Sequence, residues 1–331
     1  MSLFTRHGGA FLSASLIALF AAALPASAKS SKDNLKVGVI AFTYSSPAVQ
    51  AMADAAMADC KQRGWTCELF DGKGDPVATS NAGVNFVNRK FDAVVNAVSD
   101  NNQLGTVIKA ANAAGIPYVS IFSGDAPGIT ADIGSSGVVQ GALIGGEVRS
   151  AIGLEGQVAV VNWNVLPVLR ERSRGLKATM ADDKNIKIVE VEVKVPGYVE
   201  DAYSKLLTLL QSNKNVKAVV VGWNELAPAA VRAIEQLGLK DKVRVYGYDA
   251  IAPAFELMRK GSPLAMVVGF SNDEAGRSAM RTVAETVDGR PTPFKALMLR
   301  SCLFTRDNMP APGQEPNYET CTPFTAELRR K

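Results

Sequence analysis

Polar and aromatic side chains directly follow several apolar segments of the chain, and their types could support binding chemistry. The polar ones are Ser46, Ser123, Arg170, Asn224 and Asp249. The aromatic ones are Phe42, Phe122, Trp163, Tyr198, Trp223 and Phe270. Aromatic rings with a few hydroxyl, amide and charged groups suit a cyclic molecule whose faces are apolar and whose rim carries hydroxyls. We therefore predict a noncovalent binding site for a small ring-shaped molecule.

Catalysis is disfavoured by what the sequence lacks. His7 is the only histidine in the chain, which weighs against Ser-His-Asp or Cys-His nucleophiles and against zinc or copper sites. The chain has no GxSxG, HExxH or Walker A motif. The segment 71–75, Asp-Gly-Lys-Gly-Asp, lacks the remaining calcium ligands and is predicted to be a turn. We predict no catalytic residue, no metal site and no cofactor; an enzyme, the alternative class, would need an unusual carboxylate pair.

Strand-like apolar segments alternate along the chain with longer helical patterns. The predicted strands cover residues 35–42, 66–70, 93–97, 117–122, 157–163, 187–193, 216–222, 243–248 and 264–269. The predicted helices cover residues 48–63, 77–89, 103–114, 168–181, 200–212, 226–237, 252–260 and 272–288. Strands that alternate with helices of this length are typical of parallel sheets built from right-handed βαβ units.

The alternation occurs twice, and a segment rich in Gly, Ser, Asp and Pro, residues 124–137, interrupts it. Because the chain exceeds what one core usually supports, we predict an α/β fold of two doubly wound parallel-sheet lobes joined by a three-crossing hinge. The crossings are expected near residues 134–136, 270–271 and 292–295. The first lobe would then contain residues 33–135 and 271–293, and the second residues 136–270 and 294–331. Ligands bind beyond the carboxyl ends of such strands, so the polar and aromatic residues named above are expected in the interlobe cleft.

The first 28 residues have the pattern of a secretory signal peptide. Arg6 and His7 precede an apolar run from Ala10 to Leu24, and Ala26-Ser27-Ala28 has the small-residue pattern of a cleavage site. A run of about 15 apolar residues is short for a bilayer span of roughly 20, which disfavours the alternative of an uncleaved anchor. We expect cleavage after Ala28 and a periplasmic location. The formal net charge of +4 gives no footprint for nucleic acid.

Four cysteines in an exported chain predict two structural disulfides. Cys60 and Cys67 bracket the turn between a predicted helix and the next strand, and Cys302 and Cys321 bracket a Pro-rich C-terminal segment. Local pairing within each couple is simpler than cross-pairing. We therefore predict a second lobe that ends in a disulfide-closed tail.

Five short motifs in order carry a resemblance to a known family. They are Tyr44-Ser45-Ser46-Pro47, Ala111-Asn112-Ala113-Ala114-Gly115-Ile116-Pro117, Leu169-Arg170-Glu171-Arg172-Ser173-Arg174-Gly175, Val221-Gly222-Trp223-Asn224-Glu225 and Val245-Tyr246-Gly247-Tyr248-Asp249. With the leader, they make the chain resemble ribose-type periplasmic solute-binding proteins of ABC sugar importers from about residue 35 to 300. The resemblance implies a type I periplasmic binding protein fold, a membrane ABC permease as partner and a monomeric receptor. A receptor linked to a sensor would share the same binding chemistry, and that alternative stays open.

By this resemblance, Arg170, Asn224 and Asp249 occupy positions where family members hydrogen-bond sugar hydroxyls, and Tyr198 lies near an aromatic that packs on the sugar ring. The chain departs from ribose binders at Phe122-Ser123, where they carry an Asp-Arg pair, and at Phe270, where they carry Gln. A sugar that needs the Asp-Arg clamp would leave hydroxyls unpaired here, at roughly 1–3 kcal/mol for each buried loss. We predict a sugar or a related cyclic compound, with a less polar cyclic or aromatic ligand as the alternative.

Several of these residues also have a purely structural interpretation. Asp249 could cap the helix predicted to begin near Ala252, which is a common use of aspartate. Phe42, Phe122 and Phe270 could be core aromatics, and Trp163 and Trp223 could close the interlobe rim without contacting ligand.

Overall fold

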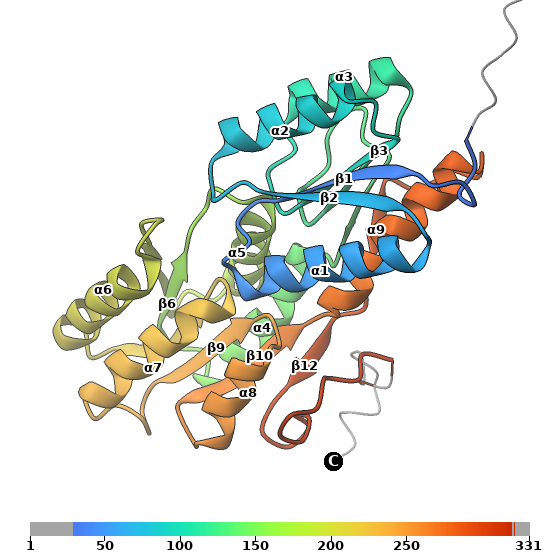
Figure 1. Cartoon of the computed structure of the whole chain (residues 1–331). Coiled ribbons are helices and arrows are strands. Elements are labelled where there is room, and N and C mark those ends of the chain that lie inside the picture. Colours follow the sequence, from blue (N-terminus) through green and yellow to red (C-terminus); the bar gives the residue numbers. More distant parts are fainter. Residues whose placement is uncertain (1–28, 320, 322–331) are drawn as a thin grey trace, which may run out of the picture.

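The computed structural model describes residues 29–319 and 321, which form two lobes of alternating strands and helices (Figure 1). Each lobe contains a six-stranded sheet covered by helices, so the predicted type I fold of two doubly wound lobes is confirmed. The predicted signal peptide, residues 1–28, lies outside the described residues, as do residues 320 and 322–331 of the predicted tail. No helix in the described part of the chain is long and apolar enough to cross a membrane.

The first lobe is a fully parallel sheet with the strand order β11-β5-β4-β3-β1-β2. Helices α1 and α9 pack on one face of this sheet, and α2 and α3 pack on the other. The strands are β1 (Lys36–Ala41), β2 (Thr66–Asp71), β3 (Ala93–Ala97), β4 (Tyr118–Ile121), β5 (Ala131–Gly134) and β11 (Ala296–Met298), and the helices are α1 (Pro47–Gln62), α2 (Pro76–Asn88), α3 (Gly105–Ala114) and α9 (Asn272–Val287).

The second lobe repeats this architecture with the strand order β12-β10-β9-β8-β6-β7, in which only the edge strand β12 runs antiparallel to its neighbour. Helices α4 and α5 cover one face, and α6, α7 and α8 cover the other. The strands are β6 (Gly156–Asn162), β7 (Ile186–Glu192), β8 (Val216–Val221), β9 (Arg244–Tyr248), β10 (Leu264–Gly269) and β12 (Cys302–Phe304), and the helices are α4 (Gly137–Ala151), α5 (Pro167–Met180), α6 (Tyr198–Ser212), the 3-10 turn η1 (Asn224–Leu226), α7 (Ala227–Gln236) and α8 (Ala252–Arg259).

Local sequence explains where the helices at the cleft begin. Pro47 and Pro167 occupy the first turns of α1 and α5, where the missing N–H costs nothing and the fixed φ favours the helix. The strands that precede them, β1 and β6, are almost wholly buried because helices cover both faces of each sheet. Each strand-to-helix loop is therefore held at both ends and brings its side chains to the carboxyl edge of its sheet.

Helix α4 and strand β5 were not predicted, because their sequences carry weak signals. Gly141 and Gly145 lie inside α4, and glycine disfavours a helix by about 1 kcal/mol relative to alanine. The structure shows why glycine is there: a Cβ on Gly141 would lie 2.0 Å from the carbonyl oxygen of Arg172 in α5. A Cβ on Gly175 of α5 would lie equally close, 2.0 Å, to the carbonyl oxygen of Val138 in α4. The two helices pack backbone against backbone.

The third crossing lies later than predicted. Strand β11 pairs with β5 of the first sheet, whereas β12 pairs with β10 of the second, so the chain changes lobe at residues 299–301. The expected boundary at 293/294 is therefore wrong, and residues 296–298 belong to the first lobe. Residues 135–136 connect β5 to α4, and residues 270–271 connect β10 to α9. Three-residue strands such as β11 and β12 are too short to show a period in the sequence.

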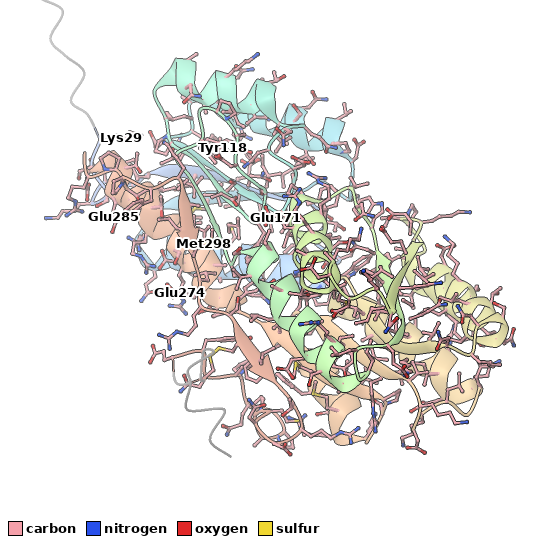
Figure 2. The ribbon with its side chains drawn as sticks, turned by 180° about the vertical axis from the view of Figure 1, so that it is seen from behind. Lys29, Tyr118, Glu171, Glu274, Glu285 and Met298 are labelled. Carbon is pink, nitrogen blue, oxygen red and sulfur yellow. A yellow bond between two sulfur atoms is a disulfide. The ribbon has the colours of Figure 1, made fainter. Side chains whose placement is uncertain are left out.

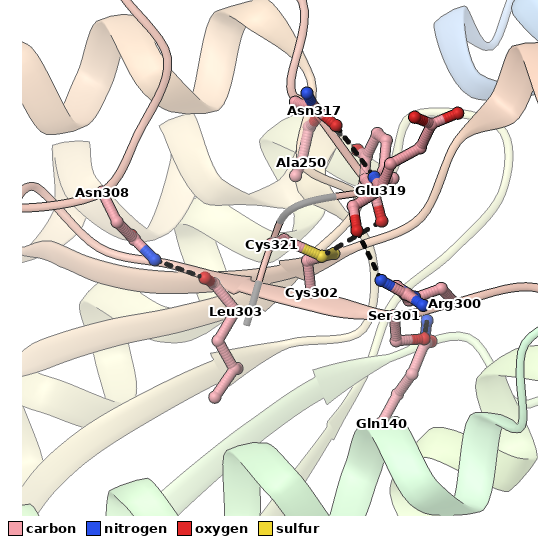
Figure 3. Close-up of a disulfide and its surroundings, with 11 residues drawn as sticks. Gln140, Ala250, Arg300, Ser301, Cys302, Leu303, Asn308, Asn317, Glu319 and Cys321 are labelled. Carbon is pink, nitrogen blue, oxygen red and sulfur yellow. Dashed lines mark hydrogen bonds between the residues drawn. A yellow bond between two sulfur atoms is a disulfide. The ribbon is translucent and has the colours of Figure 1, made fainter. Parts of the chain in front are cut away.

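Both predicted disulfides are present. Cys60 at the end of α1 is joined to Cys67 in β2, with a Cα–Cα distance of 6.4 Å. Cys302 in β12 is joined to Cys321, with a Cα–Cα distance of 5.8 Å, which holds the C-terminal tail against the second lobe (Figure 3). From this tail, the Tyr318 hydroxyl donates a hydrogen bond of 3.4 Å to the carbonyl oxygen of Ala250.

Candidate ligand-binding site

A cavity of about 270 Å³ lies between the lobes at the carboxyl ends of their strands. Eight of the eleven residues predicted for ligand contact line it: Phe42, Ser46, Phe122, Trp163, Tyr198, Trp223, Asp249 and Phe270. Aliphatic side chains from both lobes complete most of the wall, among them Val49, Met52, Val98, Leu166, Val168 and Leu169. Most of the residues chosen because they follow the carboxyl ends of the predicted strands therefore line one cavity. The wall of this cavity is largely apolar.

The aromatic side chains in the wall contact one another in pairs. The Phe122 and Phe270 rings have centroids 4.2 Å apart, and the Tyr198 and Trp223 rings have centroids 5.3 Å apart. Phe42 of the first lobe approaches Trp163 of the second, at 6.2 Å. The lobes thus already touch across the cleft through aromatic faces. Phe42, Phe122 and Phe270 also belong to the buried core, so their predicted structural and lining roles coincide.

Backbone strain is concentrated in the cavity wall. Lys73, Val98, Phe122 and Asp249 have φ values of +51°, +76°, +54° and +64°, in the left-handed region that non-glycine residues rarely occupy. All four line the cavity. Such conformations cost on the order of 1–3 kcal/mol each and persist where the surrounding structure enforces them, which is typical of ligand sites.

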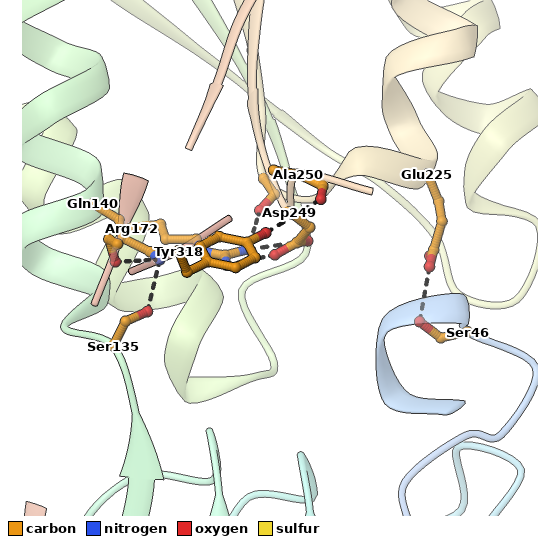
Figure 4. A network of polar contacts seen from close by, with 10 residues as sticks. Ser46, Ser135, Gln140, Arg172, Glu225, Asp249, Ala250 and Tyr318 are labelled. Atoms are coloured by element: carbon orange, nitrogen blue, oxygen red, sulfur yellow. Dashed lines mark hydrogen bonds and ion pairs between the residues drawn. The ribbon is translucent and has the colours of Figure 1, made fainter. Parts of the chain in front are cut away.

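A buried ion pair between Arg172 and Asp249 forms the polar end of the cavity (Figure 4). The Arg172 side chain is only 3% exposed, and its Nη2 donates to Asp249 Oδ1 at 2.8 Å. Its other N–H groups donate to Gln140 Oε1 and to the carbonyl oxygen of Gly222, each at 3.0 Å. The guanidinium also lies 4.6 Å from the centre of the Tyr248 ring. The arginine end of the pair is therefore held by several further contacts.

Asp249 does not cap α8, because the N-cap of that helix is Ile251 and no side chain caps it. Its structural partner is Arg172, a residue that sequence reasoning missed. The prediction chose Arg170 from the same motif instead. Two positions on an α-helix are about 200° apart around its axis, so the two arginines point to nearly opposite sides of α5. The buried positions of α5 recur at helical spacing and include Arg172 but not Arg170. This spacing was the signal that could have identified Arg172.

Arg170 does not line the cavity but joins the lobes beside it. Its Nη2 donates to Asp100 Oδ2 of the first lobe at 3.1 Å, and its Nη1 donates to the carbonyl oxygens of Asn164, at 3.2 Å, and of Val165. Its side chain is 38% exposed. The guanidinium therefore holds an interlobe contact in place of the predicted contact with ligand.

Ser123 and Asn224 also lie outside the lining. The Ser123 hydroxyl is buried in the first lobe, where it donates to the carbonyl oxygen of Ile121 at 3.0 Å and accepts from Asn96 Nδ2 at 3.1 Å. Asn224 begins the η1 turn and is buried, and its Oδ1 has no hydrogen-bond partner among the described residues. Both residues follow strands as predicted, and both are buried without lining the cavity.

Glu225, which sequence reasoning also missed, brings a carboxylate into the wall. Its Oε1 accepts a hydrogen bond of 2.8 Å from the Ser46 hydroxyl of the opposite lobe (Figure 4). Its Oε2 accepts from Trp223 Nε1 at 2.7 Å and from the Tyr198 hydroxyl at 3.3 Å. Burial raises the pKa of Glu225 above its ordinary value, and the nearby Asp249 carboxylate adds to the rise. Burial, followed by the Glu225 charge, raises the pKa of Tyr198 to about 12, which keeps its hydroxyl protonated.

A second cavity of about 160 Å³ lies on the hinge side, near Glu171 and Met298 as seen from behind the molecule (Figure 2). Phe122 lines both cavities, so its ring lies between them. Asp132 of β5 is partly buried in this wall and accepts hydrogen bonds from the Ser120 hydroxyl at 2.5 Å and the Ser123 N–H at 3.1 Å. Burial raises the pKa of Asp132 to about 6, in spite of those hydrogen bonds.

The family model of the periplasmic binding protein domain matches residues 37–300, which covers both lobes. The chain belongs to the periplasmic binding protein family. Its members are solute-binding components of ABC importers and are not enzymes, and their compartment is the periplasm. Within the part of the chain that the structure describes, no group of three or more His, Cys, Asp or Glu residues could hold a metal ion.

Relatives of this binding protein include sugar receptors. It is 22% identical to the ribose import binding protein of Escherichia coli over 264 residues. The aligned region covers 78% of this chain and 87% of the relative. It is 28% identical over 222 residues to the D-apiose import binding protein of Paraburkholderia graminis, which covers 64% of this chain and 69% of the relative. A solved ABC transporter solute-binding protein from Mycobacterium smegmatis, with bound glycerol, has a TM-score of 0.78 at 25% identity and covers 86% of this chain and 98% of that one.

Proposed function

We propose that this binding protein captures a sugar-like small molecule between its lobes and delivers it to the membrane permease of an ABC importer. The observation that carries the proposal is the interlobe cavity, which combines aromatic faces with the polar groups of Arg172, Asp249 and Glu225. The ribose and D-apiose receptors among its relatives support a sugar or polyol as the ligand class. Export after cleavage at Ala28 and action as a monomer belong to the same proposal.

A less polar cyclic or aromatic ligand is the second candidate, and the cavity wall favours it. Phe122 and Phe270 stand where ribose binders carry charged or amide partners, and both rings line the cavity. Apart from Arg172, Asp249 and Glu225, the interior offers few groups that could satisfy the hydroxyls of a fully oxygenated sugar. A hydroxyl buried without a partner costs about 1–3 kcal/mol, so each missing partner lowers affinity for such a sugar.

A thermal-shift panel of pentoses, hexoses, deoxysugars, cyclitols and aromatic acids tests the binding function. A true ligand at about 100 times its Kd adds roughly 2.7 kcal/mol of stability and raises the melting temperature. The best hit is then added to protein in solution, and small-angle scattering is expected to show a smaller radius of gyration, because a ligand held by both lobes favours the closed state. The proposal would be contradicted if no compound of the panel produced a thermal shift and none produced a compaction.

A matched pair of tryptophan variants localises the binding. Trp163→Phe removes part of the cavity wall, whereas Trp65→Phe makes the same change in the first lobe, where the Trp65 Nε1 donates to the carbonyl oxygen of Ser31 at 3.0 Å. We expect weaker binding of the best hit only for Trp163→Phe. Uptake of that compound by cells with and without the gene measures delivery to the permease.

A further inference from the structure

Glu225 is a charged group in the cavity wall whose charge is not cancelled by a neighbour. The charged residues of the wall are Lys73, Arg172, Glu225 and Asp249. Arg172 and Asp249 form a pair at 2.8 Å and neutralise each other. Lys73 is exposed to solvent. Among the described residues, no lysine or arginine forms an ion pair with Glu225, so this carboxyl group has no cationic partner in the wall of the cavity.

The hydrogen bonds that Glu225 receives orient its carboxylate without neutralising it. All three donors, Ser46, Trp223 and Tyr198, are neutral groups. Trp223 Nε1 can only donate, so the Oε2 that it contacts must be an acceptor. A carboxylate withdrawn from water without a cation is costly, and proteins normally pair such a charge. The raised pKa of Glu225 reflects the same deficit.

The surroundings of Glu225 favour a cation in a second way. Tyr198 and Trp223, whose rings are 5.3 Å apart, both line the cavity beside the carboxylate that they contact. The face of an aromatic ring attracts a positive charge, and tryptophan does so best. Phe42 and Trp163 add two more rings to the same cavity, and the remaining wall is mainly aliphatic.

We propose that the ligand carries a positively charged nitrogen, bound by the Glu225 carboxylate and the rings of Tyr198 and Trp223, on a largely apolar body of ring size. The inference rests on the proposed function, because it names the class of molecule that the interlobe cavity captures. A neutral sugar would leave the Glu225 charge uncompensated, whereas an ammonium group would pair with it. Because Ser46 comes from the opposite lobe and also contacts Glu225, the cation site is complete only when the lobes are closed.

Matched probes that differ in charge test this inference. Choline and its uncharged counterpart 3,3-dimethylbutan-1-ol form one pair, and cyclohexylamine and cyclohexanol form another. Titration calorimetry with the mature protein at neutral pH is expected to show that the cation of at least one pair binds about tenfold more tightly, a difference of roughly 1.4 kcal/mol. Glu225→Gln keeps the shape of the side chain and is expected to remove that preference. Glu256→Gln, an exposed position on α8, is the matched control and should keep it.

The outcomes separate this inference from the proposed function. If neutral members bind as tightly as the cations, or if sugars from the thermal-shift panel bind and the cations do not, the cationic ligand class is wrong and the receptor function stands. If no probe and no member of the panel binds, the proposed function itself fails. The preference of the unaltered protein for the cationic member of a probe pair is measured without the Glu225→Gln variant, so the test holds even if that variant does not fold. Tyr198→Phe, with Tyr203→Phe on the same helix as its control, repeats the test through a donor to the carboxylate.

Discussion

Breaking the buried Arg172–Asp249 pair should destabilise the protein far more than breaking an exposed pair of the same chemistry. The two side chains are 3% and 10% exposed, so removing one partner leaves the other charge without water. Such a loss costs about 3–5 kcal/mol, and the remaining bonds of Arg172 to Gln140 and Gly222 favour the lower end for Asp249→Asn. A free energy of unfolding near 5–15 kcal/mol would still leave the variant folded.

The matched control is the pair formed by Glu200 and Arg232, whose nitrogen–oxygen distance of 2.7 Å is similar but whose side chains are 72% and 47% exposed. Glu200→Gln should lower the free energy of unfolding far less than Asp249→Asn, because exposed pairs contribute little. Urea unfolding followed by far-ultraviolet circular dichroism measures each variant, and the double variant Arg172→Met with Asp249→Asn completes a thermodynamic cycle. Equal costs for Asp249→Asn and Glu200→Gln would refute the reasoning, as would a coupling energy near zero between Arg172 and Asp249.

Three further predictions follow from other parts of the molecule. Because the folded-state pKa of Asp132 is about 6 and its ordinary value is 3.8, the folded state holds this proton more tightly. The stability that this proton contributes is therefore full below about pH 4 and is lost as the pH rises through about 6, by up to roughly 3 kcal/mol. Urea unfolding across this range should show a difference in stability between the native chain and Asp132→Asn that changes with pH. A difference that stays constant with pH would contradict this prediction. Replacing Cys302 and Cys321 by serine opens a loop with a sequence separation of 19. This change should lower the free energy of unfolding by about 3 kcal/mol. An unchanged urea midpoint would rule this prediction out. Arg170→Ala removes the exposed interlobe bond to Asp100 and should lower the closed-to-open ratio of the unliganded protein by at most about fivefold, seen as a larger radius of gyration in scattering; a fully open molecule would show that this bond carries more than an exposed pair can.

The parts of the fold that sequence predicted are those with strong local signals. Buried strands such as Ala93–Ala97 and helices with a proline in the first turn were placed within one or two residues. Helix α4 was missed because its glycines serve contact with α5, and nothing local reveals that partner. β11 and β12 gain their strand geometry from pairing with β5 and β10, which are distant in sequence.

The candidate site shows the same limit at the level of single side chains. Strand ends indicated the correct loops, so Asp249 and Trp223 were placed in the wall correctly. Helix phase and turn geometry decide which of two nearby side chains points into the cavity. Arg172 and Glu225 line it, whereas Arg170 and Asn224 do not. The partners of those side chains come from other loops and from the other lobe, so single-residue patterns do not reveal them. Whether each lining residue contacts a ligand stays a prediction for the binding experiments.

The interleaved lobes have a consequence for how the chain folds. Residues 137–269 supply α4 to α8 and β6 to β10 in one uninterrupted stretch, so nearly all of the second lobe can assemble from neighbouring segments. The first lobe cannot, because α1 packs on α9 and β5 pairs with β11, both of which the chain reaches only after residues 137–269. Closing such long loops is entropically costly and slow. We expect the lobe synthesised first to be the lobe that finishes folding last, with the α1 surface that α9 covers exposed to water until then.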